Sequence, residues 1–115
     1  MRLDQARELL DDALNLSLAI RVSRNVALCL IAFARLALAE GDPERAALAA
    51  GAADGLRRRS GRRAWPVLRH GEDELTARIR QALGIDRFDQ AFASGARLSQ
   101  REAAAAVRGR PGPGR

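Results

Sequence analysis

Apolar residues recur at steps of three and four positions from Leu3 to about Ile20, and acidic and amide side chains fill most of the positions between them. This periodicity predicts an amphipathic α-helix with one buried face. From Val26 to Glu40 nearly every position is apolar, which indicates a helix that is covered on several sides. The polar segment 21–25 predicts an interruption or a bend between the two helices.

The tripeptide Gly41-Asp42-Pro43 predicts a tight turn into a third helix over 43–60. Glycine tolerates the positive φ that commonly ends a helix. Aspartate accepts hydrogen bonds from the free amides of the next helix, and proline suits its first position. A connection this short places the two helices side by side in antiparallel orientation.

Small side chains dominate both sides of this turn, and they predict that the helices over 26–40 and 43–60 approach almost backbone to backbone. Gly51 and Gly55 support this expectation. Each glycine weakens a helix by roughly 1 kcal/mol relative to alanine, so it is best explained where another backbone packs against it. The residues predicted to form this repeat packing are Ala34, Gly41, Ala46, Ala50 and Ala53.

Three further helices are predicted in the second half of the chain. The first begins at Glu72 or already at Pro66, and the second carries two phenylalanines four residues apart. Ser99 and Glu102 form a capping-box pattern that opens the last helix. The glycines predicted to end helices in this half are Gly61, Gly84 and Gly95.

The composition agrees with an all-α fold of five or six helices. Alanine, the best helix former, occurs 24 times, and β-branched residues are scarce. A chain of 115 residues suits one compact domain. We therefore predict a single helical-repeat domain over 1–107, followed by a flexible Gly/Pro/Arg tail over 108–115.

The net charge of +6 is unevenly distributed, with −2 over 1–56 and +8 over 57–115. If the arginines within 57–69 shared one face, they could neutralise several phosphates, and a nucleic-acid-binding accessory role is therefore the alternative function. The competing interpretation is a solvated helix end, where the helix dipole favours cations. The candidate residues are Arg57, Arg58, Arg59, Arg62, Arg63 and Arg69.

No catalytic, cofactor or metal site is predicted, and we expect the chain not to be an enzyme. His70 is the only histidine and lacks a neighbouring cysteine. Cys29 is the only cysteine, which excludes an internal disulfide and fits a reducing compartment. No phosphate-binding loop occurs, and the most apolar stretch is too short to cross a membrane. A cytoplasmic protein without a membrane partner is therefore expected.

The chain contains an internal similarity, because segment 3–16 aligns with segment 43–56 at a shift of 40 residues. Segment 30–56 resembles a tetratricopeptide repeat. It has a small residue in its first helix, a Gly-Asp turn, and alanines at positions 46 and 53. The family's large aromatic positions are filled by Leu30 and Ala37. The resemblance implies antiparallel helix pairs that bind other polypeptides.

A narrower resemblance extends from residue 3 to about residue 107. The repeat is followed by Arg80 with Leu83-Gly84, two phenylalanines, a Gly-x-x-Leu-Ser turn and an alanine-rich helix. This order is similar to the C-terminal helical region of actinobacterial LuxR-type and ATPase-containing transcriptional regulators with MalT-like repeats. The resemblance implies a regulatory scaffold for protein–protein contact, either as an excised domain or as a small independent relative.

Self-association is also predicted. Repeat arrays need roughly three repeats for independent stability, and this chain has fewer. The first helix therefore lacks a neighbour, and its side formed by Leu9, Leu16 and Ala19 needs a cover. A symmetric homodimer is the commonest way to supply one.

Overall fold

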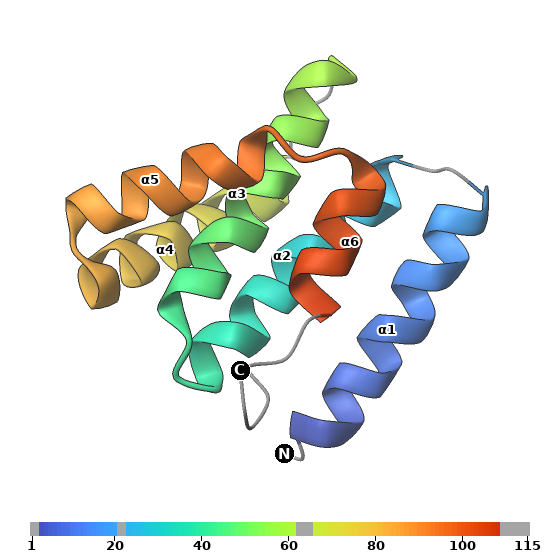
Figure 1. Ribbon diagram of the computed structural model, residues 1–115, viewed down its shortest axis with the longest axis horizontal. Coiled ribbons are helices and arrows are strands. Elements are labelled where there is room, and N and C mark those ends of the chain that lie inside the picture. The colour runs from blue at the N-terminus through green and yellow to red at the C-terminus, as the bar shows by residue number, and fades with distance from the viewer. Residues whose placement is uncertain (1–2, 21–22, 62–65, 109–115) are drawn as a thin grey trace.

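The computed structural model describes residues 3–20, 23–61 and 66–108, and within these ranges every regular element is an α-helix (Figure 1). The all-α class and the expected number of helices are thus confirmed. The predicted tail, apart from Arg108, lies outside the described residues. The helices are α1 (Leu3–Ile20), α2 (Ser23–Ala39), α3 (Pro43–Arg59), α4 (Pro66–Leu83), α5 (Ile85–Ala96) and α6 (Gln100–Arg108).

The helix ends follow local sequence signals. Gly41 has a φ of +82°, and the Asp42 carboxylate accepts a hydrogen bond of 3.1 Å from the N–H of Arg45. At α6, the N–H of Ser99 donates to the Glu102 carboxylate, and the N–H of Glu102 donates to the Ser99 hydroxyl. The predicted Gly-Asp-Pro turn and capping box are therefore confirmed.

Helix α3 lies at the centre of the molecule and contacts α2, α4, α5 and α6 (Figure 1). Almost its whole middle section is buried, and small side chains there let four helices surround it. Eleven of the 23 buried hydrophobic residues are alanines, which keeps the distances between helices short. The buried residues of α3 are Ala46, Ala47, Ala49, Ala50, Gly51, Ala52, Ala53, Gly55 and Leu56.

Helices α3 and α5 approach each other backbone to backbone at three glycines. A Cβ atom on Gly51 would lie 2.1 Å from the carbonyl oxygen of Phe92, and one on Gly55 would lie 2.2 Å from that of Ala96. From the other side, a Cβ on Gly95 would meet the Leu48 carbonyl oxygen at 2.0 Å. The sequence correctly indicated a backbone against the two α3 glycines, but that backbone belongs to α5 rather than to α2.

The large core side chains come from helices around α3. The largest fully buried ones are Phe33, Leu14, Leu30, Ile79, Val26 and Val107. Phe88 is buried, and its ring lies 5.3 Å from that of the half-buried Phe92. The short helix α6 contacts α1, α2 and α3 and buries Ala103, Ala104 and Val107. It therefore closes one side of the α1–α2 pair and leaves another side of that pair open.

Candidate functional site

An apolar groove runs between α1 and α2 on a side that α6 does not line. Its α1 wall is formed by leucine and alanine, and its α2 wall is formed by alanine, leucine and one arginine. Apolar clefts of this kind are typical binding sites for a helix or for large side chains of another polypeptide. The lining residues are Leu3, Ala6, Leu9, Leu10, Ala32, Arg35, Leu36 and Ala39.

Two leucines of α1 project beside this groove without cover. Leu9 is 69% exposed and Leu16 is 64% exposed, and their spacing of seven residues places them on one face of the helix. Leu28 on α2 is 38% exposed. Single exposed leucines are ordinary, but here several lie on the two helices that form an apolar groove. We call the groove together with Leu9, Leu16 and Leu28 the α1–α2 face.

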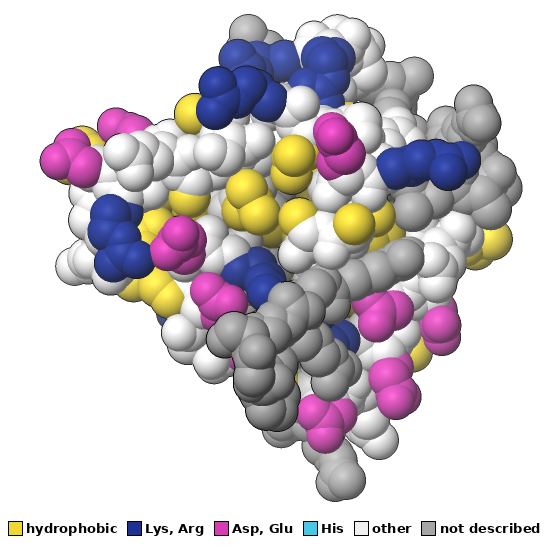
Figure 2. Space-filling model, viewed as in Figure 1, with side chains coloured by type: hydrophobic (Ala, Val, Ile, Leu, Met, Phe, Trp, Pro, Cys, Tyr) yellow, Lys and Arg dark blue, Asp and Glu magenta, His cyan; other side chains and the backbone are white. Residues whose placement is uncertain are grey.

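Charged side chains lie on both helices that form the groove. Asp4, Glu8 and Asp12 follow one another at four-residue spacing along α1, and all three are exposed. Acidic side chains gather over α1 at the lower right of Figure 2. On α2, Arg35 is exposed and is the only charged residue lining the groove. The groove is therefore apolar apart from Arg35, and the acidic row of α1 lies outside its lining.

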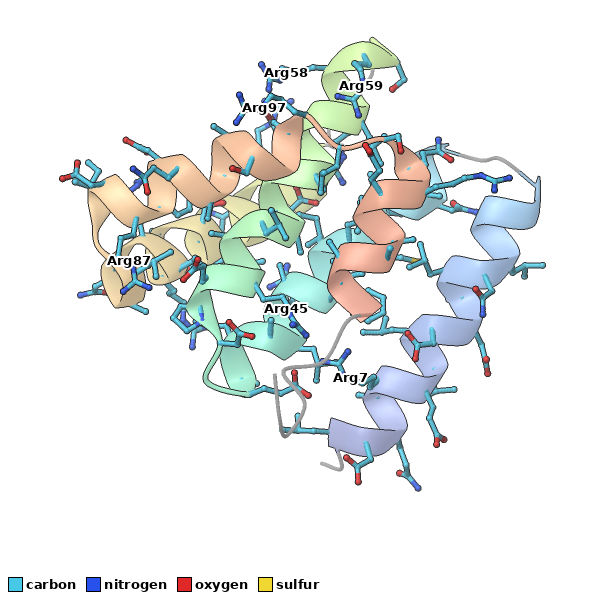
Figure 3. All side chains as sticks on the ribbon, in the orientation of Figure 1. Arg7, Arg45, Arg58, Arg59, Arg87 and Arg97 are labelled. Carbon is cyan, nitrogen blue, oxygen red and sulfur yellow. The ribbon has the colours of Figure 1, made fainter. Side chains whose placement is uncertain are left out.

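Arg7 fixes how α1 lies on the rest of the molecule, although the sequence analysis did not select it. Its side chain is almost completely buried and pairs with the Glu40 carboxylate at 2.5 Å (Figure 3). It also donates to the carbonyl oxygen of Val107 at 3.4 Å and lies 5.9 Å from the Phe33 ring centroid. The sequence does contain a signal for this burial, because Arg7 lies in the apolar stripe of α1 between Leu3 and Leu10.

The predicted basic cluster does not form one continuous free surface among the described residues. Arg57 makes a bidentate ion pair with Glu72 of α4 at 2.5 and 3.1 Å. Arg58 pairs with Asp54 at 2.9 Å, and Arg69 lies on α4. Two further members, Arg62 and Arg63, lie outside the described residues.

Arg59 has a structural contact that the sequence did not reveal. Its guanidinium donates to the carbonyl oxygens of Ala96 at 2.7 Å and Leu98 at 2.6 Å, where α5 ends. A cation is favoured at the carboxyl end of a helix, and here that helix is α5 rather than its own. Arg97 lies close by, so three arginines gather where α3 and α5 end: Arg58, Arg59 and Arg97 (Figures 2 and 3).

The residues predicted for the repeat packing lie on α2, on α3 and in the turn between them. Ala34, on α2, is fully buried. Ala46 and Ala53 are fully buried on α3, and Ala50 is 4% exposed. Gly41 occupies the turn between the two helices with its positive φ. These residues therefore serve the internal packing of the molecule, and the α1–α2 face is the candidate site.

The described residues hold no group of three or more metal-ligating side chains that could bind an ion. His70 is exposed on α4 and lies 3.9 Å from Glu74, one turn further along. Cys29 is half-buried on α2 and forms no disulfide. The α1–α2 face itself presents leucine, alanine and a few charges. Such side chains are suited to contact with another polypeptide.

The chain was compared with protein-family models, with curated proteins and with solved structures, and none of the three comparisons found a significant match. None of the helices in the described part of the chain is both long enough and apolar enough to cross a membrane.

Proposed function

We propose that this chain is a non-catalytic protein–protein interaction module whose binding surface is the α1–α2 face. The observation that carries the proposal is the exposure of Leu9 and Leu16 beside an apolar groove. Burying a leucine side chain contributes roughly 1.5–3 kcal/mol, so two uncovered leucines are a strong driving force for association. Helix pairs that offer such grooves commonly bind a helix of another polypeptide.

The proposal includes a tetratricopeptide-like pairing of the helices and a role as a regulatory scaffold. The tight turn between α2 and α3 and the small residues on both helices support the pairing. The resemblance to the repeat region of LuxR-type transcriptional regulators supports the scaffold role. Cytoplasmic location is part of the same proposal, since a lone cysteine suits a reducing compartment.

We further propose that one occupant of the α1–α2 face is a second copy of the chain, forming a homodimer. The expectation that the Leu9 and Leu16 side of the first helix needs a cover agrees with the exposure of both side chains. In a symmetric dimer, the same face of both copies would be buried in a single interface.

Substitution of both leucines tests the module. The variant Leu9→Glu/Leu16→Glu should lose self-association in sedimentation velocity and should lose protein partners in a pull-down from the source cell. Ile85→Glu is the matched control, because Ile85 is 61% exposed on α5, outside the α1–α2 face. If the double variant associated and bound partners like the parent, the α1–α2 face would not be the binding surface.

Nucleic-acid binding is the second candidate function, and the gathering of Arg58, Arg59 and Arg97 at one end of the molecule favours it (Figure 3). Phosphate contacts by these arginines would make binding fall steeply with salt. Titration of labelled DNA at two salt concentrations tests this candidate, with an Arg58/Arg59/Arg62/Arg63→Ala variant for comparison. Absence of binding at low salt would exclude it.

A further inference from the structure

Three arginines gather at one end of the molecule, where α3 and α5 end (Figure 3). The guanidinium of Arg59 donates to the carbonyl oxygens of Ala96 and Leu98, the residues on either side of Arg97, so Arg59 and Arg97 are neighbours. Arg58 directly precedes Arg59 on α3. We call Arg58, Arg59 and Arg97 the arginine end.

The positive charge of the arginine end is only partly compensated by carboxylates of the same copy. Arg58 pairs with Asp54 at 2.9 Å, and both side chains remain exposed. Arg97 is exposed, and neither Arg59 nor Arg97 forms a salt bridge in the described part of the chain. The arginine end can therefore bind carboxylates of another molecule.

Helix α1 presents carboxylates in an arrangement that suits such a surface. Asp4, Glu8 and Asp12 are exposed at four-residue spacing, which places them in one row at intervals of about 6 Å. None of the three forms a salt bridge with another described residue, and none lines the α1–α2 groove. We call these three residues the acidic row.

The acidic row and the arginine end lie on different sides of the molecule. Acidic side chains gather over α1 at the lower right of Figure 2, whereas arginines lie at its top. The same polarity is present in the sequence, with a net charge of −2 over 1–56 and +8 over 57–115. The two surfaces can therefore meet between copies but not within one copy.

We propose that copies of this chain associate head to tail, with the acidic row of one copy docked on the arginine end of the next. Opposite charges across an interface favour association, and arginine binds a carboxylate through two parallel hydrogen bonds. The contact joins two different surfaces, so each pair of copies keeps one free acidic row and one free arginine end. Such a contact produces chains or rings, unlike the symmetric homodimer.

The head-to-tail contact does not depend on the α1–α2 face, and the experiment keeps the two apart. All measurements use a Leu9→Gln/Leu16→Gln background, which removes the exposed leucines of the proposed homodimer without adding charge. Sedimentation velocity at about 0.1 M salt is suitable, because the screening length is then about 10 Å. Charges in contact still interact at this salt concentration, while the net charge of more distant parts is largely screened.

Mixing two variants tests the contact. The background chain should form species that grow beyond a dimer with concentration. Arg58→Gln/Arg97→Gln disables the arginine end, and Glu8→Gln/Asp12→Asn disables the acidic row, so each variant alone should sediment as a monomer. An equimolar mixture should form a complex that stops at one copy of each, because only one competent acidic row and one competent arginine end are present.

Two control variants change the net charge by the same amounts elsewhere. Arg78→Gln/Arg87→Gln and Asp86→Asn/Asp89→Asn alter exposed residues of α4 and α5 outside both surfaces. Arg87 lies at the opposite end of α5 from Arg97 (Figure 3). Both control variants should associate like the background chain.

Three results would overturn the head-to-tail contact. The first is association of either disabled variant alone at the strength of the background chain, and the second is failure of their mixture to form a complex. The third is a background chain that stays monomeric at high micromolar concentration, even if its arginine end binds labelled DNA. If the parent instead dimerises only through Leu9 and Leu16, the proposed function stands and this inference fails.

Discussion

Single arginines connect parts of this molecule that are distant in the sequence. Arg7 joins α1 to the ends of α2 and α6, Arg57 joins α3 to α4, and Arg59 joins α3 to the end of α5. Arginine suits these positions because its planar guanidinium donates several hydrogen bonds in a fixed geometry. These three arginines therefore have a structural role that is independent of any partner.

Removal of the Arg7 side chain should release α1 and α6 together. Arg7→Met leaves the Val107 carbonyl and the partly buried Glu40 carboxylate without this donor, which should lower the free energy of unfolding by about 1–3 kcal/mol. Hydrogen exchange should show reduced protection in α6. Arg58→Met is the matched control, since an exposed pair such as Arg58–Asp54 contributes under about 1 kcal/mol. Equal stability of the two variants would contradict the role given to Arg7.

At the scale of helices, glycine makes the α3–α5 contact possible. Gly51 and Gly55 on one helix and Gly95 on the other each lie against backbone atoms of the opposite helix. A side chain can rotate away from an added methyl group, whereas a packed backbone has to move as a whole. The two helices can therefore keep their present separation only without Cβ atoms at these positions.

Alanine substitutions should thus act in opposite directions at two helical glycines. Gly51→Ala places a methyl group against the Phe92 carbonyl and should destabilise the fold by about 1–3 kcal/mol in chemical denaturation. Gly71→Ala should instead stabilise it by about 0.5–1 kcal/mol. Among the described residues beyond its own helix, its Cβ would meet only the Arg35 side chain, at 3.6 Å, and alanine favours the helix. A stabilising effect at both positions would contradict the close α3–α5 approach.

Helices and their ends were predictable from the sequence, because their signals lie within a few residues. Gly41, Asp42 and Pro43 specify the turn, and Ser99 with Glu102 specifies the start of α6. Local signals do not determine which helix packs against which. The small residues of α3 indicated a close neighbour, but its identity as α5 depends on contacts across about 40 residues. The contact of Arg59 with Ala96 could not be predicted for the same reason, because these residues are also far apart in the sequence.

At the scale of the whole molecule, the open α1–α2 face links stability to concentration. If two copies cover this face, dimerisation adds to the stability of each, and the melting temperature should rise with protein concentration. Calorimetry across a hundredfold range of concentration measures this rise. The Leu9→Glu/Leu16→Glu variant should melt at a temperature independent of concentration. Independence in the parent as well would contradict the proposed homodimer.

The central position of α3 has a consequence for how the protein unfolds. Helix α3 shares contacts with four of the other described helices, so its departure would leave each of them with an uncovered apolar side. Loss of structure should therefore be all-or-none for this part of the chain. Proteolytic cleavage after α3 would yield two fragments that remain associated, because neither fragment can bury its apolar side chains by itself.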